Sequence, residues 1–188
     1  MRRNSHRRAT LVDAAIEVLA EQGARGLTFR AVDAAAEVPP GTASNYFASR
    51  DDLLGHIAAR VYERIRPDEE SIARQLVGEQ DRDHLVTVMR AAVRRISEFR
   101  SGYLALLELR LEATRRPEIR AVLTRDVRKD IDDNVSAHQA SDFPGDATSV
   151  RLLHLALNWL IVERLTLPDV FSEEEAEELI GDAVERLT

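Results

Sequence analysis

Residues 27–54 read LTFRAVDAAAEVPPGTASNYFASRDDLL. Thr28 and Ser49 are typical helix N-caps, because a Ser or Thr hydroxyl accepts a hydrogen bond from a backbone N–H in the first helical turn. Pro39 and Pro40, between them, cannot continue a helix but fit the first turn of a new one. The stretch therefore predicts two short helices joined by a tight turn, over about 28–36 and 39–47, and then a longer helix over about 50–65.

The second of these short helices is expected to present small and hydrogen-bonding side chains. Val38 and Phe47 are apolar and would fill the junction between the helices. The residues left on or near the outer face are Pro40, Gly41, Thr42, Ser44, Asn45 and Tyr46. A helix that enters the major groove of DNA needs such an exterior, because an Asn side chain can pair with adenine through two hydrogen bonds and hydroxyls can bond bases or phosphates.

The stretch resembles the DNA-binding domain of the TetR (tetracycline-repressor) family, whose pattern is approximately L-T-x-R-x-[IVL]-A-x-x-A-G-V-s-x-G-[ST]-[LIV]-Y-x-[YH]-F-x-[SN]-[KR]-x-x-L. The resemblance covers about residues 7–66. The residues that fit the pattern are Leu27, Thr28, Arg30, Val32, Ala36, Val38, Gly41, Thr42, Tyr46, Phe47, Ser49, Arg50, Leu53 and Leu54.

The resemblance implies a role for each polar position. Thr28, Arg30 and Tyr46 would bond DNA phosphates, and Arg50 would hold another phosphate beside the positive end of the long helix. The bases and the adjacent backbone would be faced by Pro40, Gly41, Thr42, Ser44 and Asn45. The arginines at positions 2, 3, 7 and 8 would form an arm on the DNA or, equally, a solvated tail.

The sequence departs from the family pattern at several positions. Glu37 stands where Gly is usual in the turn, and Asp33 stands where Ala is usual, so that its acid would weaken phosphate attraction. Pro39, Ala43 and Ser44 replace a usual Ser or Thr, a larger aliphatic residue and a frequent Tyr. For Arg30, a salt bridge with Asp33 or Asp51 is an alternative to a phosphate contact.

The rest of the chain also predicts helices, and no segment alternates apolar and polar residues as a strand would. A first helix is expected over about 7–22, with Gly23 as its C-terminal cap. Later ones are expected over about 68–78, 82–99, 102–114, 117–139, 147–166 and 172–186, the last opened by the capping box of Ser172 and Glu175. The prediction is an all-α chain of about nine helices.

This all-α chain is expected to divide by function. Residues 1–50 would be a three-helix helix-turn-helix DNA-binding domain, residues 51–66 a connecting helix, and residues 67–188 a helical bundle that binds a ligand and dimerises.

Charge is distributed unevenly along a chain whose formal net charge is −7. Residues 1–66 hold ten Arg against eight acidic residues, whereas residues 67–188 hold sixteen cationic against twenty-five acidic ones. A local basic face can therefore bind phosphates on an acidic protein. The absence of cysteine excludes disulfides and thiolate metal sites and fits a reducing cytosol, so we expect a cytoplasmic protein.

Neither a membrane span nor a signal peptide is expected. The longest nearly apolar run, Leu152–Val162, is too short to cross a bilayer. The basic N-terminus is not followed by an apolar segment.

The resemblance places a ligand pocket among the central helices. Its polar anchors would include Tyr103, His138, His154 and Asn158, and a mostly apolar lining would suit a small lipophilic effector. The residues expected to line it are Met89, Val93, Phe99, Tyr103, Leu107, Leu111, His154, Asn158 and Trp159.

The last two helices are the expected dimer interface. In the family, two such helices from each subunit form a four-helix bundle, and the two-fold axis sets the recognition helices roughly 34–36 Å apart. The expected interface residues are Val150, Leu153, Leu157, Ile161, Leu179, Ile180 and Val184. The alternative is that these apolar stripes only close the monomer.

Other classes of function fit the sequence less well. It contains no HExxH, no Walker lysine and no GxSxG, so we expect neither an enzyme nor a metal or organic cofactor. A structural nucleoid protein is disfavoured by the net acidity and by the apolar C-terminal helices. The expectation is a regulator that binds a palindromic operator as a dimer and is released by its effector, a repressor by preference but with activation left open.

Overall fold

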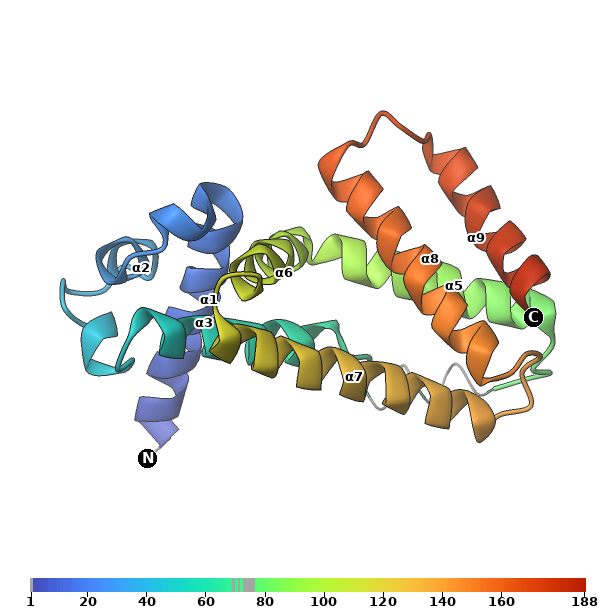
Figure 1. Ribbon diagram of the computed structural model, residues 1–188, viewed down its shortest axis with the longest axis horizontal. Coiled ribbons are helices and arrows are strands. Elements are labelled where there is room, and N and C mark those ends of the chain that lie inside the picture. The colour runs from blue at the N-terminus through green and yellow to red at the C-terminus, as the bar shows by residue number, and fades with distance from the viewer. Residues whose placement is uncertain (1, 69, 71, 73–76) are drawn as a thin grey trace. The chain divides into compact units, whose positions relative to one another are not determined.

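The computed structural model describes residues 2–68, 70, 72 and 77–188, with side chains from Ser5 onward. Within these residues all regular structure is helical, in agreement with the prediction (Figure 1). Most of the helix expected over 68–78 lies outside the described residues, as do the side chains of Arg2 and Arg3.

The chain forms two compact units, and the first combines Met1–Arg66 with Phe99–Asp126. It contains α1 (Arg2–Gly26), α2 (Phe29–Ala35), the 3₁₀ turn η1 (Ala43–Asn45), α3 (Arg50–Ile65), α6 (Arg100–Ala113) and the start of α7 (Pro117–Gln139). α6 packs against α1 and α3. Large apolar side chains fill the interior, among them Leu11, Ile16, Leu19, Leu54, Ile57 and Leu109, each exposed by 0%.

Polar contacts also fasten α1 to α3 within this unit. The Arg60 guanidinium donates from Nε and Nη2 to the two Asp13 carboxylate oxygens at 2.8 and 3.1 Å. These bonds, with one to Glu63, raise the pKa of Arg60 above its ordinary value, so the group stays charged at any working pH.

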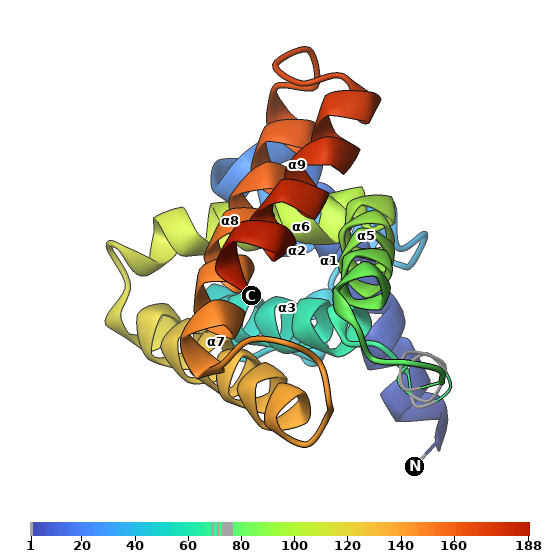
Figure 2. The same cartoon turned by 90° about the vertical axis from the view of Figure 1, so that its right-hand side faces the viewer.

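The second unit combines Pro67–Glu98 with Val127–Thr188. It holds α5 (Arg82–Glu98), the rest of α7, α8 (Ala147–Thr166) and α9 (Glu173–Leu187), and α8 and α9 lie side by side (Figures 1 and 2). Leu85 of α5, Leu153 of α8 and Val184 of α9 meet in its core, with Met89 and Phe143 packed around them.

The predicted caps are confirmed. The Thr28 hydroxyl accepts from the Ala31 N–H at 3.1 Å, and the Ser49 hydroxyl accepts from the Asp52 N–H at 3.1 Å. Ser172 and Glu175 form the expected reciprocal capping box at the start of α9. Gly23 interrupts α1 with a φ of 66°, a left-handed conformation that suits Gly and ends the regular part of the helix.

The second short helix, predicted over 39–47, is wrong in its extent. The structure has only the 3₁₀ turn Ala43–Asn45, preceded by turns at residues 40–42. Gly41 has a φ of 88°, which no α-helix contains. A Cβ at Gly41 would meet no atom within 4 Å, so Gly is required there by the backbone conformation and not by space.

Glu37 is also left-handed, with a φ of 52°, which explains why the family usually has Gly at this place.

Among the described residues, none of the helices combines the length and the hydrophobicity that a membrane-spanning segment needs.

Candidate nucleic-acid interface

Residues 40–46, which we call the turn segment, carry most of the positions predicted to face DNA. Pro40, Gly41, Ser44 and Asn45 are exposed, whereas Thr42 and Tyr46 are half-buried. Ala43, between them, is completely buried, and Phe47 follows at 2% exposure. The small Ala43 and the large Phe47 anchor the turn segment, and the polar side chains around Ala43 are left facing outward.

Asp33 of α2 holds the turn segment through two hydrogen bonds to its backbone. Its Oδ2 accepts from the Gly41 N–H and its Oδ1 from the Ala43 N–H, each at 2.7 Å. Asp33 is exposed by only 3%. The expectation that this acid weakens phosphate attraction at the surface was therefore wrong, because the carboxylate is buried and bonded to backbone amides. An acid in place of the usual Ala was the sequence signal for this role.

Arg8 of α1 contacts the far end of the turn segment. Its Nη2 donates to the Tyr46 carbonyl oxygen at 3.0 Å, and its guanidinium carbon lies 5.8 Å from the centroid of the Phe47 ring. Arg8 contacts the turn segment in this way and is nevertheless exposed, so its guanidinium also faces solvent.

Thr28 and Arg30, at the start of α2, are both exposed. The alternative salt bridges for Arg30 are not formed, because Asp33 bonds the backbone amides and Asp51 pairs with Arg116. Among the residues that the structure describes, Arg30 is thus available to a phosphate.

Arg50 is placed differently from the prediction. Its side chain is half-buried, and its Nη2 donates to the Ala24 carbonyl oxygen at the end of α1. The N–H of Ala24 donates in turn to Glu108 Oε2 of α6 at 3.1 Å. Ala24 therefore joins α1, α3 and α6, and Arg50 already has a partner inside its own unit.

The residues predicted for the dimer interface lie mainly inside the second unit. Leu153, Leu157, Ile161, Ile180 and Val184 are each exposed by 8% or less, Val150 is half-buried, and Leu179 is exposed by 41%. The side chains of the five buried residues contribute to the unit's own core, as the alternative of stripes that close the monomer predicts.

The exposed apolar side chains of α8 lie on a different face of that helix. Leu152, Leu155 and Trp159, which we call the α8 stripe, are exposed by 44%, 64% and 64%. Their spacing of three and four residues places them along one side of the helix. Trp159, predicted to line a ligand pocket, lies on this exposed face of α8.

The other predicted pocket residues fall in both units. Val93 and Tyr103 are buried, Leu111 is exposed by 56%, and the half-buried ones are Met89, Phe99, Leu107, His154 and Asn158. The Phe99 ring is covered by the Arg64 guanidinium, whose central carbon lies 3.7 Å from the ring centroid. Burial raises the pKa of Tyr103 to about 12.

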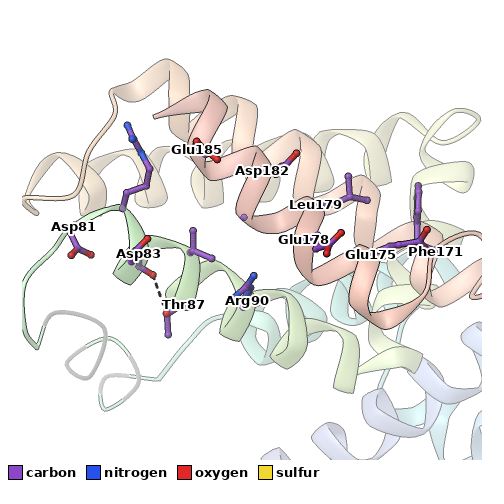
Figure 3. A pocket seen from close by; sticks show the side chains of 13 residues that line it. Asp81, Asp83, Thr87, Arg90, Phe171, Glu175, Glu178, Leu179, Asp182 and Glu185 are labelled. Carbon is purple, nitrogen blue, oxygen red and sulfur yellow. Dashed lines mark hydrogen bonds between the residues drawn. The ribbon is translucent and has the colours of Figure 1, made fainter.

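An open groove in the second unit runs between α5 and α9, with a volume of about 1180 Å³ (Figure 3). Acidic side chains dominate its lining, namely Asp81, Asp83, Glu175, Glu178, Asp182 and Glu185, and Arg90 lies among them. None of the predicted pocket residues lines it. Within the described ranges, no group of three or more His, Asp or Glu side chains is placed to hold a metal ion.

Comparisons with known families agree with this geometry. The family described as bacterial regulatory proteins, tetR family, matches residues 11–57, and that described as tetracyclin repressor-like, C-terminal domain, matches residues 80–188. The chain belongs to the TetR family. It is a DNA-binding transcriptional regulator of that family, with the turn segment in its helix-turn-helix.

A curated relative is the HTH-type transcriptional regulator BetI of Rhizobium meliloti (strain 1021), 29% identical over 117 residues. The match covers 62% of this chain and 57% of the length of BetI.

Several solved structures are similar over nearly the whole chain. The multidrug binding protein EbrR, complexed with imidazole, is 27% identical with a TM-score of 0.66, and the match covers 96% of this chain and 94% of EbrR. SCO1917 of Streptomyces coelicolor A3 is 26% identical with a TM-score of 0.67, covering 96% and 97%. A regulator from Mesorhizobium loti reaches a TM-score of 0.78 at 16% identity, covering 98% and 96%, and so supports the fold alone.

Proposed function

We propose that this TetR-family regulator is a ligand-responsive repressor. It binds a palindromic operator as a homodimer, in the cytoplasm where that DNA lies, and leaves the operator when a small lipophilic effector binds. The observation that carries the proposal is the turn segment, which exposes Ser44 and Asn45 on a backbone that Asp33 holds by hydrogen bonds, together with the exposed Thr28 and Arg30 at the start of α2.

The contacts divide into two kinds. Thr28, Arg30 and Tyr46 are assigned to phosphates, and they fix the position of the protein on the duplex without reading its sequence. Pro40, Gly41, Thr42, Ser44 and Asn45 are assigned to base edges and the adjacent backbone, with Asn45 as the main candidate for a bidentate contact to adenine. For Arg50 the bond to Ala24 favours a structural role.

The α8 stripe supports dimer formation. Two Leu and one Trp side chain exposed along one helix form an apolar surface that a second copy of the chain would cover. Leu179 of α9, exposed by 41%, is the one predicted interface residue that remains strongly exposed. We therefore assign the interface to the α8 stripe and Leu179 in place of the buried residues first expected.

The backbone of Ala24 offers a route from the effector to the DNA. α6 carries Tyr103, Leu107 and Leu111 of the predicted pocket, and it also carries Glu108, which holds the Ala24 N–H. A shift of α6 on ligand binding would displace the end of α1 and, through Arg50, the start of α3. We propose that α3 then swings and that the spacing between the two recognition segments of the dimer changes, so that both half-sites can no longer be bound together.

The experiment starts by selecting preferred DNA sites from a random pool with the wild-type protein. We expect an inverted repeat whose half-sites are separated by about one helical turn, or a multiple of it, with two chains bound per site. Transcription in vitro from a promoter overlapping the site then distinguishes repression from activation. Proflavin, which EbrR holds in a solved structure, is the first compound to test for release. Recovery of sites without symmetry, or a bound monomer, would contradict the proposal.

A further inference from the structure

One residue of α2 holds three backbone amides of the segment that follows it. The Asp33 carboxylate accepts from the Gly41 and Ala43 N–H groups at 2.7 Å each, and the Asp33 carbonyl oxygen accepts from the Val38 N–H at 3.0 Å. Bonds from backbone N–H groups to a carboxylate are of the strong, charge-assisted kind, and this residue is only 3% exposed.

The turn segment requires the Asp33 carboxylate because its own backbone lacks carbonyl acceptors for two of its N–H groups. Pro39 and Pro40 have no N–H, and the left-handed φ of Gly41 interrupts any helical ladder. The Gly41 and Ala43 amides therefore have no carbonyl of a preceding helical turn as partner, and the carboxylate takes that place.

The side chains assigned to DNA depend on this arrangement. The Ser44 hydroxyl donates to the Gly41 carbonyl oxygen at 2.8 Å, and the Asn45 N–H donates to the Thr42 carbonyl oxygen at 3.0 Å. Asp33 therefore holds Gly41 and Ala43 against α2. Ser44 is bonded to Gly41, and Asn45 is bonded to Thr42, which lies between the two held residues.

We propose that Asp33 is the positioning residue of the turn segment: without touching DNA, it sets the presentation of Ser44 and Asn45 and thereby the preference for the operator over other DNA. The inference rests on the proposed operator-reading role of the turn segment and adds the residue that controls it.

The test compares Asp33→Asn with the wild-type protein. The amide has the same shape, but its NH₂ group must face one of the two backbone N–H donors. We expect affinity for the selected operator to fall about tenfold or more, and affinity for unrelated DNA of equal length to fall less than about threefold. Salt concentration and the folded fraction are held equal in the two measurements.

Asp146 provides a matched control. Its carboxylate also accepts from two backbone amides, those of Thr148 and Ser149 at 2.7 and 2.9 Å, but it caps α8 in the other unit. Asp146→Asn should leave the ratio of operator to unrelated affinity unchanged. An equal loss of both affinities in Asp33→Asn, or a change of the ratio in Asp146→Asn of the same size, would overturn the proposal.

Amide hydrogen exchange tests the contact itself without DNA or any variant. In the wild-type protein the Gly41 and Ala43 amides should exchange slowly although they lie outside an α-helix, and in Asp33→Asn they should exchange about tenfold faster or more. Unprotected amides in the wild type would overturn the positioning role. A wild-type protein that is protected at both amides but shows no DNA preference would instead overturn the proposed function.

Discussion

The turn segment and the α8 stripe are both exposed, but they are built from opposite kinds of side chain. The turn segment presents hydroxyls and an amide on a backbone fastened by the buried Asp33. The α8 stripe presents two Leu and a Trp along one helix. The first suits a charged and hydrated partner such as DNA, and the second suits an apolar surface of its own kind. The two regions therefore support the two partners proposed for this chain, operator DNA and a second copy of the chain.

The strongest test of this contrast is Trp159→Glu, which places a charge in the middle of the α8 stripe. We expect a monomer by analytical ultracentrifugation and a loss of operator affinity of about 100-fold or more, because a monomer engages only one half-site. Val77→Glu is the control, since Val77 is also a strongly exposed apolar residue, by 72%, but lies before α5 and not on α8. A Trp159→Glu protein that remains dimeric would remove the α8 stripe from the interface.

Asn45→Ala tests whether the turn segment reads bases. The expected result is a loss of discrimination at one base position of roughly 1–3 kcal/mol, measured by gel-shift titration on operator variants, with binding to unrelated DNA unchanged.

Arg30→Ala should behave differently from Asn45→Ala. It should weaken binding to all DNA and reduce the salt dependence by about one phosphate contact. Tyr46→Ala is expected to do the same, and Arg120→Ala, an exposed arginine of α7, is the control. If Asn45→Ala and Arg30→Ala lower the affinity equally for every DNA sequence, the distinction between base contacts and phosphate contacts is wrong.

Arg50→Ala separates a structural from a DNA-binding role at the start of α3. Loss of the bond to the Ala24 carbonyl oxygen should lower the stability of the first unit by about 1 kcal/mol and its Tm by about 4–8 °C. Arg25→Ala, an exposed neighbour near Ala24, should leave the Tm unchanged. If Arg50→Ala keeps its Tm and loses DNA affinity with a reduced salt slope, the original phosphate assignment is correct.

The smallest expected effect is a pH dependence at Tyr103. Its pKa of about 12 in the folded protein exceeds the ordinary value of 10, so the folded state retains a proton that the unfolded state loses above pH 10. Stability is therefore complete below pH 10 and falls by about 1 kcal/mol by pH 11 and further toward pH 12. Tyr103→Phe should remove this part of the slope in denaturant titrations at pH 9 and 11. An unchanged slope would show that Tyr103 is not buried in solution.

Local rules allowed the helices and their ends to be predicted well. The caps at Thr28, Ser49 and Ser172 involve residues three apart or closer, so their geometry follows from the sequence. The extent of the second short helix could not be predicted, because it depends on the left-handed Gly41 and on a carboxylate ten residues before Ala43. The role of Asp33 depends on the same long-range bond.

The turn segment and the outer face of α8 also differ in how well the sequence predicted them. The outward turn positions were predicted from the expectation that the apolar Val38 and Phe47 fill the junction, and in the structure Phe47 is buried, together with Ala43. α8 has large apolar residues all round, with Leu153 and Leu157 inward and Leu152 and Leu155 outward. A helix that is apolar on every side gives no period from which its core face can be read. Arg50 likewise fits a family position, but the nearby Ala24 carbonyl gives it a partner within the protein.

By itself, the sequence determined the all-α class, the places where helices begin and the family to which the chain belongs, because these depend on residues close together along the chain. Only the tertiary structure decided which face of α8 is covered, where the Arg50 guanidinium points and what the Asp33 carboxylate holds. The physical reason is that burial and hydrogen bonding of such groups are settled by whichever element packs against them, and that element is distant in sequence.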